Sequence, residues 1–502
     1  MIRLRALSVL SSAACCGLPA LAASCESLAA LAIPSTAIRS AVLVSAGPSS
    51  AGRGAGQGGQ LPAYCRVGAV ATPVAGSEIH IEVWLPEAAV WNGKLLGTGN
   101  GGYSGALGFA DMERGLRQGY AVAGSDTGHA GGDLKFGLRQ PEKIDDWAWR
   151  AVHVMTETPK LVVRSYYGRL PRHSYFAGCS TGGQQALTEA QRFPADYDGI
   201  AAGAPGNNRV RLNVGFLWSW LAANQGGAAS LPSAKLGLIH QAAVRACDAS
   251  DGLKDGLISD PRSCTFDPAT LACKAGDAAD CLTPPQAAAV GAIYDGAKNP
   301  RTGERLYPGW VRGSETGWNA YFVGQPEPAR LDFWRYWVFD DPNWDFRSFD
   351  FDRDVAFADN RMEFLTANDP DLTRFRAGGG RLLLYQGLAD PVVPPDDTIR
   401  YFETVERGMG GLESTSRSVR LFLAPGMGHC AGGEGPGSFD PLPVLDRWVA
   451  GGETPERIIA THTVNGTVDR SRPLCPYPQI ARWKGSGSID DASSFECAVA
   501  GR

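Results

Sequence analysis

Apolar runs between residues 79 and 205 predict strands that alternate with helices. Residues 79–86 (IHIEVWLP) alternate apolar and polar positions, which is the pattern of a strand with one buried face. Continuous apolar runs typical of buried strands begin residues 94–102, 120–129, 174–193 and 199–205. Helical spacing over residues 145–168 indicates a helix that ends at Gly168. The alternation predicts an α/β fold with a mostly parallel sheet covered on both faces.

This alternation stops at about residue 207 and resumes after residue 375. The intervening segment is rich in tryptophan and proline and carries four cysteines. Strand-like runs return at residues 381–394 and 419–433, and each leads into a loop with one polar candidate, Asp390 or His429. We therefore predict a catalytic domain of residues 23–206 and 376–502, and an insertion over 207–375. An insertion at the carboxyl ends of the strands would cover the active site as a lid domain.

The first 22 residues have the features of a secretory signal peptide. Arg3 and Arg5 precede a short apolar stretch, and Ala20-Leu21-Ala22 supplies a small-residue cleavage site. A membrane anchor is the alternative, but the stretch is short for a span, and Cys15 and Cys16 lack a convincing lipobox. We expect a secreted or periplasmic protein without a membrane span.

The composition is that of a globular protein, and the charge pattern argues against a nucleic-acid partner. Of 502 residues, 44% are hydrophobic and 20% are charged, with a formal net charge of −5. The chain has no basic tract and no stripe of arginines and aromatic residues, so we expect no nucleic-acid partner.

Ten of the 12 cysteines follow the predicted signal, and this even number predicts five disulfides in an exported chain. Close spacing suggests the local pairs Cys247–Cys264, Cys273–Cys281 and Cys475–Cys497. Zinc is the competing interpretation, but no C-x-x-C pair occurs and no nearby histidine completes a site.

A G-x-S-x-G motif at residues 178–182 places Ser180 on the turn between a predicted strand and a helix. A serine hydroxyl needs a base within hydrogen-bond reach and a group that orients the base. Ser180, Asp390 and His429 follow the chain order of the α/β-hydrolase triad, each after a strand. We therefore predict an α/β-hydrolase fold with these three residues as nucleophile, orienting acid and base.

Other residues compete for the acid and base roles. Asp396 and Asp397 share the loop of Asp390, which we prefer because it follows the strand sooner. Beyond Asp390 the alternative histidine is His462, but only His429 closely follows a clear strand.

Two backbone N–H groups are needed to bind the oxyanion of the tetrahedral intermediate. One should come from Thr181, the residue after the serine, and the other from the glycine-rich residues 97–105. Gly101 and Gly102 are the candidates, and a plain flexible turn is the alternative.

Cysteines flank two of the three predicted catalytic residues. Cys179 directly precedes Ser180, and Cys430 directly follows His429. If Ser180 and His429 are in contact, the two cysteines must also be close. We therefore predict a Cys179–Cys430 disulfide that joins the nucleophile loop to the base loop.

An acidic loop between Cys247 and Cys264 is a candidate Ca²⁺ site. Asp248, Asp251 and Asp255 supply hard oxygen ligands, although the spacing is not that of an EF-hand. A solvated acidic turn is the alternative.

Together these features resemble the tannase and feruloyl esterase family of α/β-hydrolases, which also contains mono(hydroxyethyl) terephthalate hydrolase. The likeness covers nearly the whole mature chain. It rests on the acidic cystine loop and on four motifs: G-C-S-T-G-G at 178–183, A-D-P at 389–391, G-H-C at 428–430 and the stretch at 472–487.

The resemblance implies roles for several further residues. Gly102 and Thr181 match the oxyanion donors, and a Cys25–Cys65 pair completes the disulfides. A structural Ca²⁺ would be held by the side chains of Asp248, Asp251 and Asp255 and by the carbonyls of Leu253 and Leu257.

We expect a secreted serine esterase that hydrolyses aromatic carboxylic esters, most readily feruloyl (hydroxycinnamoyl) esters, through an acyl-enzyme. Galloyl esters and terephthalate monoesters are the alternatives, and a non-catalytic polyphenol- or carbohydrate-binding protein is the alternative from a different class. The candidates for an aromatic acyl pocket are Trp310, Trp318, Trp334, Trp337 and Trp344, for any one of which core packing is the competing role.

Overall fold

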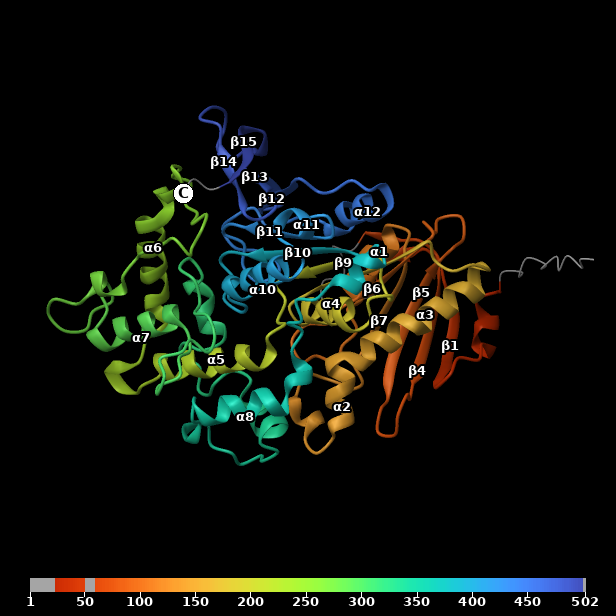
Figure 1. Cartoon of the computed structure of the whole chain (residues 1–502), viewed down its shortest axis with the longest axis horizontal. Helices are drawn as coiled ribbons and strands as arrows, with labels where there is room; N and C mark the ends of the chain where they lie inside the picture. The colour runs from red at the N-terminus through yellow and green to blue at the C-terminus, as the bar shows by residue number, and fades with distance from the viewer. Residues whose placement is uncertain (1–22, 50–58, 500–502) are drawn as a thin grey trace, which may run out of the picture.

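A mixed sheet of nine strands in the described part of the chain forms the centre of the molecule (Figure 1). The structure is a computed structural model that describes residues 23–49 and 59–499, so the predicted signal peptide lies outside the described residues. In spatial order the strands are β1 (Thr36–Val44), β4 (Tyr64–Ala71), β5 (Ile79–Pro86), β7 (Ala121–Ser125), β6 (Lys94–Thr98), β8 (His173–Cys179), β9 (Gly199–Gly203), β10 (Arg381–Gly387) and β11 (Val419–Ala424).

The two halves of this sheet differ in strand direction. From β7 through β6, β8, β9 and β10 to β11 every pair is parallel, whereas β1, β4, β5 and β7 pair antiparallel. The parallel half carries the candidate residues, because Ser180, Asp390 and His429 follow β8, β10 and β11. The fold is thus an α/β-hydrolase-like mixed sheet flanked by helices, and β1 and β4 are additions that the sequence analysis did not identify.

Helices cover both faces of the sheet and bury its alternating side chains. One face packs on α3 (Ala151–Tyr167), α4 (Thr181–Arg192) and α10 (Pro395–Gly408), and the other on α1 (Phe109–Arg117) and α12 (Pro441–Gly451). Leu382 and Leu384 of β10 point to the first face, and Leu383 points to the second. Helix α3 ends at the predicted position, where Gly168 adopts a left-handed conformation with φ 70°.

The segment between β9 and β10 contributes helices but no strand among its described residues. Its longer helices are α5 (Arg209–Ala223), α6 (Leu236–Cys247), α7 (Pro284–Asp295) and α8 (Arg353–Arg361), which lie to the left of and below the sheet in Figure 1. Their apolar side chains share one core with Tyr103 and Trp147 from the chain before β8. The inserted segment is therefore packed directly onto the sheet-forming part of the molecule.

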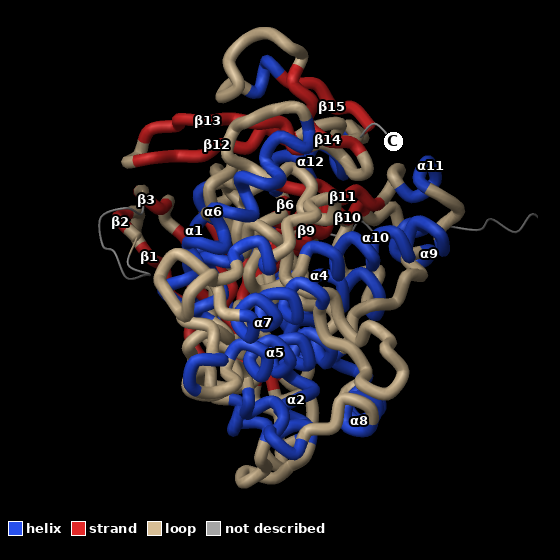
Figure 2. The backbone as a smooth tube through the Cα atoms, turned by 90° about the vertical axis from the view of Figure 1, so that its left-hand side faces the viewer, coloured by secondary structure: helices blue, strands red, loops and turns tan. Residues whose placement is uncertain are grey.

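The C-terminal residues form two small antiparallel sheets outside the main one. They pair β12 (Ile458–Val464) with β13 (Thr467–Leu474), and β14 (Gln479–Trp483) with β15 (Phe495–Val499). Figure 2 shows all four strands together at one end of the molecule. Among residues 23–49 and 59–499, no helix combines the length and the apolar character needed to cross a bilayer.

Five disulfides join the cysteines of the described residues in the expected pairs. They are Cys25–Cys65, Cys179–Cys430, Cys247–Cys264, Cys273–Cys281 and Cys475–Cys497. Four of them close short or moderate loops, whereas Cys179–Cys430 spans 251 residues and encloses the whole inserted segment.

Candidate active site

Ser180 lies on a tight turn between β8 and α4. Its backbone angles are φ 63° and ψ −118°, a conformation that is rare for residues other than glycine. The turn is fixed on both sides, because the Ser180 N–H donates to Gly203 O at 2.9 Å and its carbonyl accepts the Gly206 N–H at 3.0 Å. The backbone is thus held where a half-buried serine side chain projects from the end of the sheet.

Glycines allow the chain to approach this turn closely. A Cβ atom on Gly178 would lie 2.6 Å from backbone atoms of Gly182, and one on Gly99 would lie 2.5 Å from the Gly182 Cα. Any larger residue at these positions would separate the end of β6, the end of β8 and the start of α4.

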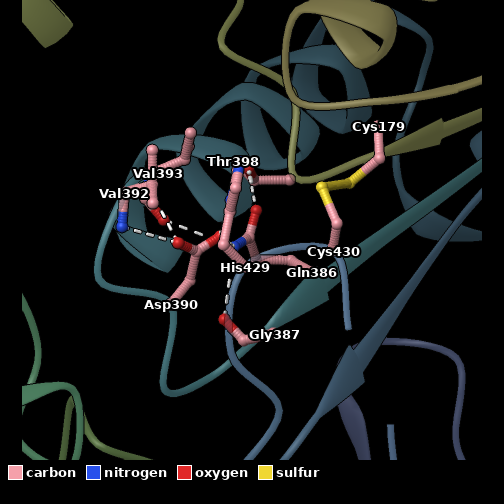
Figure 3. The surroundings of a disulfide bond; sticks show 9 residues. All are labelled: Cys179, Gln386, Gly387, Asp390, Val392, Val393, Thr398, His429 and Cys430. Carbon is pink, nitrogen blue, oxygen red and sulfur yellow. Dashed lines mark hydrogen bonds and ion pairs between the residues drawn. A yellow bond between two sulfur atoms is a disulfide. The ribbon is translucent and has the colours of Figure 1, made fainter. Parts of the chain in front are cut away.

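Asp390 and His429, which the sequence predicts to be the orienting acid and the base, form a direct hydrogen bond. Asp390 Oδ2 accepts the Nδ1–H of His429 at 2.8 Å (Figure 3). The carboxylate is fully buried, and its Oδ1 accepts the backbone N–H groups of Val392 and Val393 at 2.7 and 3.0 Å. The carboxylate therefore cannot rotate freely, and it fixes the tautomer that leaves His429 Nε2 free to accept a proton.

Gln386 and Thr398 complete the support of the carboxylate and were not identified from the sequence. Gln386 Nε2 donates to Asp390 Oδ2 at 3.0 Å, and the Thr398 hydroxyl donates to Gln386 Oε1 at 2.8 Å (Figure 3). A glutamine inside the apolar run of β10 is the signal that could have revealed this, since a buried amide needs partners.

The Cys179–Cys430 disulfide brings the serine turn and the histidine loop together, with a Cα–Cα distance of 5.9 Å (Figure 3). Cys430 also has a positive φ, of 65°, so both segments adopt unusual conformations at the bridge. Within the described residues, no direct hydrogen bond links the Ser180 hydroxyl to His429. Bonds of this kind are often long until substrate is bound.

The two candidate oxyanion donors are held together by side-chain contacts. The Thr181 hydroxyl donates to the Gly102 carbonyl at 2.7 Å, and Gly102 has φ 58°. The backbone N–H groups of Gly102 and Thr181 make no hydrogen bond within the described part of the chain. Both remain available to an oxyanion.

Arg209 is a buried residue that stabilises this arrangement and was missed in the sequence. Its guanidinium donates to Thr181 Oγ1 at 3.0 Å and to the side chain of Gln184, and it lies 5.2 Å from the ring centroid of Trp147. Burial lowers the pKa of Arg209 to about 10, so the residue stays charged near neutral pH. The first turn of α4 is therefore linked to α5 of the inserted segment.

The competing acid and base residues lie elsewhere. Asp396 pairs with Arg400, and His462 pairs with Asp469 on β13. Asp397 is buried against Tyr307 and Asn208, and burial raises the pKa of its carboxyl to about 7. In the described part of the chain, none of the three forms a hydrogen bond or ion pair with His429.

Two cavities flank the candidate residues. One of about 140 Å³ is lined by His429 and Pro391 on one side and by Ile258 and Gly317 of the inserted segment on the other. A larger one of about 780 Å³ is lined by residues that include Gly101, the Cys179–Cys430 disulfide, Tyr385 and Phe439.

Four of the five candidate tryptophans are packed in the core. Trp310, Trp318, Trp334 and Trp337 are at most 1% exposed, whereas Trp344 is half-buried and stacks on Phe339. For the first four, packing is therefore the role that the structure supports, and they do not line either of these cavities.

The acidic loop between Cys247 and Cys264 has the donors of a hard cation, but they are not gathered around one point. Asp248 Oδ1 accepts the N–H groups of Asp255 and Gly256, both at 3.0 Å, and Asp251 Oδ1 accepts that of Leu253 at 2.9 Å. Asp255 Oδ2 accepts a hydrogen bond from Arg472 at 2.7 Å. Among the described residues, the carboxylate oxygens of Asp248, Asp251 and Asp255 do not all lie within 4.8 Å of one another. Carboxylate and carbonyl oxygens fit Ca²⁺ in kind, and binding would require them to draw together.

Comparison with known proteins gives one consistent result. A family model described as tannase and feruloyl esterase matches residues 65–498. An uncharacterized esterase of Xanthomonas campestris pv. campestris is 39% identical, over 95% of this chain and 91% of its own. The mono(2-hydroxyethyl) terephthalate hydrolase of Piscinibacter sakaiensis is 33% identical over 88% and 85%. The crystal structure of feruloyl esterase B from Aspergillus oryzae superimposes with a TM-score of 0.88 at 30% identity, and covers 94% of this chain and 99% of its own.

Proposed function

Because this chain belongs to the tannase and feruloyl esterase family and is thus a carboxylic ester hydrolase, we propose that it hydrolyses aromatic carboxylic esters, with feruloyl (hydroxycinnamoyl) esters preferred. The non-catalytic alternative is therefore not retained. The preference for feruloyl esters is supported by the similarity to feruloyl esterase B over nearly the full length of both chains.

In the proposed reaction, Ser180 Oγ attacks the ester carbonyl and His429 Nε2 takes the serine proton. The backbone N–H groups of Gly102 and Thr181 bind the oxyanion of the tetrahedral intermediate. Its collapse breaks the bond to the alcohol, which leaves with the proton from His429. Water then gives a proton to His429 and attacks the acyl-enzyme. Collapse of this second intermediate breaks the bond to Ser180 Oγ, which takes the proton back from His429 as the acid is released.

The single observation that carries this mechanism is the hydrogen bond between the buried Asp390 and His429. The loop of His429 is joined by the Cys179–Cys430 disulfide to the residue before Ser180. An orienting carboxylate with four N–H donors around it can stabilise the imidazolium that forms when the base takes the proton. Gly317 of the inserted segment lies against Pro391, and this segment and His429 line the same cavity, which supports the role of the segment as a lid.

Two other acyl groups are the alternatives. Terephthalate monoesters are favoured by the 33% identity to the Piscinibacter sakaiensis hydrolase, and galloyl esters are the second family substrate class. The deciding experiment is a comparison of kcat/KM on methyl ferulate, methyl gallate and mono(2-hydroxyethyl) terephthalate. A higher kcat/KM on either of the last two would contradict the feruloyl preference, and no turnover of p-nitrophenyl acetate would contradict the mechanism itself.

We also propose a structural Ca²⁺ in the acidic cystine loop, held by Asp248, Asp251 and Asp255 and by the carbonyls of Leu253 and Leu257. A bound ion would supply no chemistry to the ester and would stiffen the loop. Export to the periplasm or the medium is supported by the five disulfides of the described residues, which are typical of oxidising compartments.

A further inference from the structure

A buried carboxylate without a hydrogen-bond partner, Glu189, lies on α4, nine residues after Ser180. Glu189 is in α4 and is fully buried, and neither of its side-chain oxygens has a hydrogen-bond partner within the described part of the chain. Burial raises the pKa of Glu189 well above its usual range, and the neighbouring Asp196 carboxylate adds to the effect through its charge and as a hydrogen-bond acceptor for the protonated acid. An unpartnered buried carboxylate is costly, so the fold must either keep it protonated or provide a cation.

Two further ligand groups face this carboxylate. His153 projects from α3, and Asp196 follows α4 in the loop that leads to β9. One ligand atom from each of His153, Glu189 and Asp196 lies within 4.8 Å of the other two, which is the only such group of three among the described histidine, cysteine and acidic residues. His153 Nδ1 and Asp196 Oδ2 form a hydrogen bond at 2.7 Å, which a bound ion would replace.

The surrounding side chains hold the three residues in place and leave a path from solvent. The His153 ring stacks on Phe193 at 3.8 Å between centroids, and Lys160 Nζ donates to the Asp196 carbonyl at 2.6 Å. The side chains of His153 and Asp196 are 25% and 12% exposed, whereas that of Glu189 forms the floor. Glu157 Oε2 lies 3.8 Å from His153 Nε2 at the exposed rim.

The local charges are those of a divalent cation site. Glu189 and Asp196 would contribute two negative charges, and Lys160 Nζ, at 3.7 Å from Asp196 Oδ1, compensates only part of them. One imidazole with two carboxylates is a ligand set that suits Zn²⁺ and related first-row ions, whereas Ca²⁺ and Mg²⁺ prefer oxygen ligands alone.

We propose that His153, Glu189 and Asp196 bind a divalent transition metal ion, with Zn²⁺ the best match, and that this ion ties α3 and the loop before β9 to the helix that carries the nucleophile. The site lies on the face of the sheet that α3 and α4 cover, and it contains none of the proposed catalytic residues. The ion is therefore structural.

The test is to titrate Zn²⁺ into the full-length protein that has been freed of metals and then supplied with excess Ca²⁺, near neutral pH. We expect the wild type to bind one more equivalent of Zn²⁺ than Glu189→Gln, by calorimetry and by metal analysis, and to show a Zn²⁺-dependent rise in Tm that this variant lacks. Glutamine has the size of glutamate and no charge, so the variant should fold without metal at least as stably as the wild type.

Two further variants separate this site from adventitious binding. Glu157→Gln changes an exposed carboxylate beside His153 and should keep the extra equivalent, whereas His153→Gln should lose it. Binding should also weaken as the pH falls, because the ligands must release protons. If the wild type and Glu189→Gln bind the same amount of Zn²⁺ with the same affinity, or if neither binds it, the metal site is wrong and Glu189 is kept as a neutral acid.

Discussion

Ser180 and Asp397 are both held by the fold in states that an unfolded chain would avoid. Ser180 has a positive φ of 63°, a conformation that costs on the order of 1–3 kcal/mol outside glycine. Asp397 is a residue of α10 whose carboxyl group is buried against Tyr307 and Asn208 of the inserted segment. The strained backbone of Ser180 presents the side chain of the proposed nucleophile. The burial of the Asp397 carboxyl makes the stability of the protein depend on pH.

Ser180→Ala should abolish nearly all esterase activity while the protein remains folded. Loss of a catalytic serine can lower kcat by on the order of 10⁶, and the residual rate comes from the oxyanion donors. The measurement is kcat on methyl ferulate for the purified variant, with circular dichroism as the control for folding. A loss of less than about tenfold, equivalent to ~1.4 kcal/mol of barrier, would show that Ser180 is not the nucleophile.

Asp397→Asn should change how stability varies with pH. Burial raises the folded-state pKa of Asp397 to about 7, against about 3.9 for an unfolded aspartate, so the folded state binds the proton more tightly. The wild type should therefore lose stability as the pH rises from about 4 to about 7, a loss that the asparagine variant avoids. Urea unfolding at both ends of this range is the measurement. If the difference in unfolding free energy between the two proteins is the same at both, Asp397 is not the titrating group.

What the sequence reveals about single residues depends on how local their signals are. Ser180, Asp390 and His429 could be proposed because each follows a strand at a recognisable spacing. Gln386 and Arg209 were missed because their partners come from distant segments that only the folded chain brings together. The role of the buried tryptophans was ambiguous as well, because the sequence alone does not show whether an indole ring packs in the core or lines a pocket.

Among the elements, the turn after β8 and the loop after β11 are the pair that must stay aligned. They belong to strands separated by β9 and β10 in the sheet, and the disulfide joins them beyond the strand ends. Small displacements of a nucleophile from its base are costly in rate.

Cys179→Ala combined with Cys430→Ala should lower kcat at temperatures where the protein is still folded. The chain-entropy model gives roughly 4.7 kcal/mol for closing a 100-residue loop, and this rises slowly for the longer loop here. Stability should therefore fall as well, so kcat is to be compared well below the Tm of the double variant. Wild-type kcat in the folded double variant would show that the bridge does not align the pair. Cys273→Ala with Cys281→Ala, which removes a short local bridge, is the matched control.

Elements were predictable where one periodicity dominates. The strands from β5 to β11 and the helix ending at Gly168 have clear apolar patterns. β1 does not, because it is an edge strand whose side chains are mostly exposed, with Ala41 as its buried residue. The pairing of β12 with β13 was likewise hidden, since the hairpin is buried at one end only and its exposed half needs no apolar pattern.

At the scale of the whole molecule, the acidic cystine loop lies where the inserted segment meets the C-terminal sheets. Arg472 of β13 forms a buried ion pair with Asp255, and Arg470 donates to the Asp255 carbonyl at 3.0 Å. A second contact joins α6 to the base loop, because His240 pairs with Glu434 five residues after His429. The order of this loop thus bears on how the inserted segment is held against the loop that carries His429.

Removal of Ca²⁺ should lower the Tm and should reduce activity only as far as the inserted segment loosens. Asp251→Asn should reproduce the loss and abolish the Tm shift on adding Ca²⁺, whereas Asp280→Asn, an exposed acidic residue of the same segment outside the loop, should not. Elemental analysis of enzyme purified without added metal checks the site directly. A folded, active sample without calcium would contradict it.

The 251-residue span of the Cys179–Cys430 bridge has a consequence for a chain that is cut. A protease that cleaves within residues 207–375, outside the small cystine loops, would produce two fragments with one half of the active site on each. The bridge would still hold these fragments as a two-chain protein, joined next to the proposed nucleophile and base. In a protease-rich medium the enzyme could thus survive a nick in its largest insertion, and would come apart into separate chains only where reductant is also present.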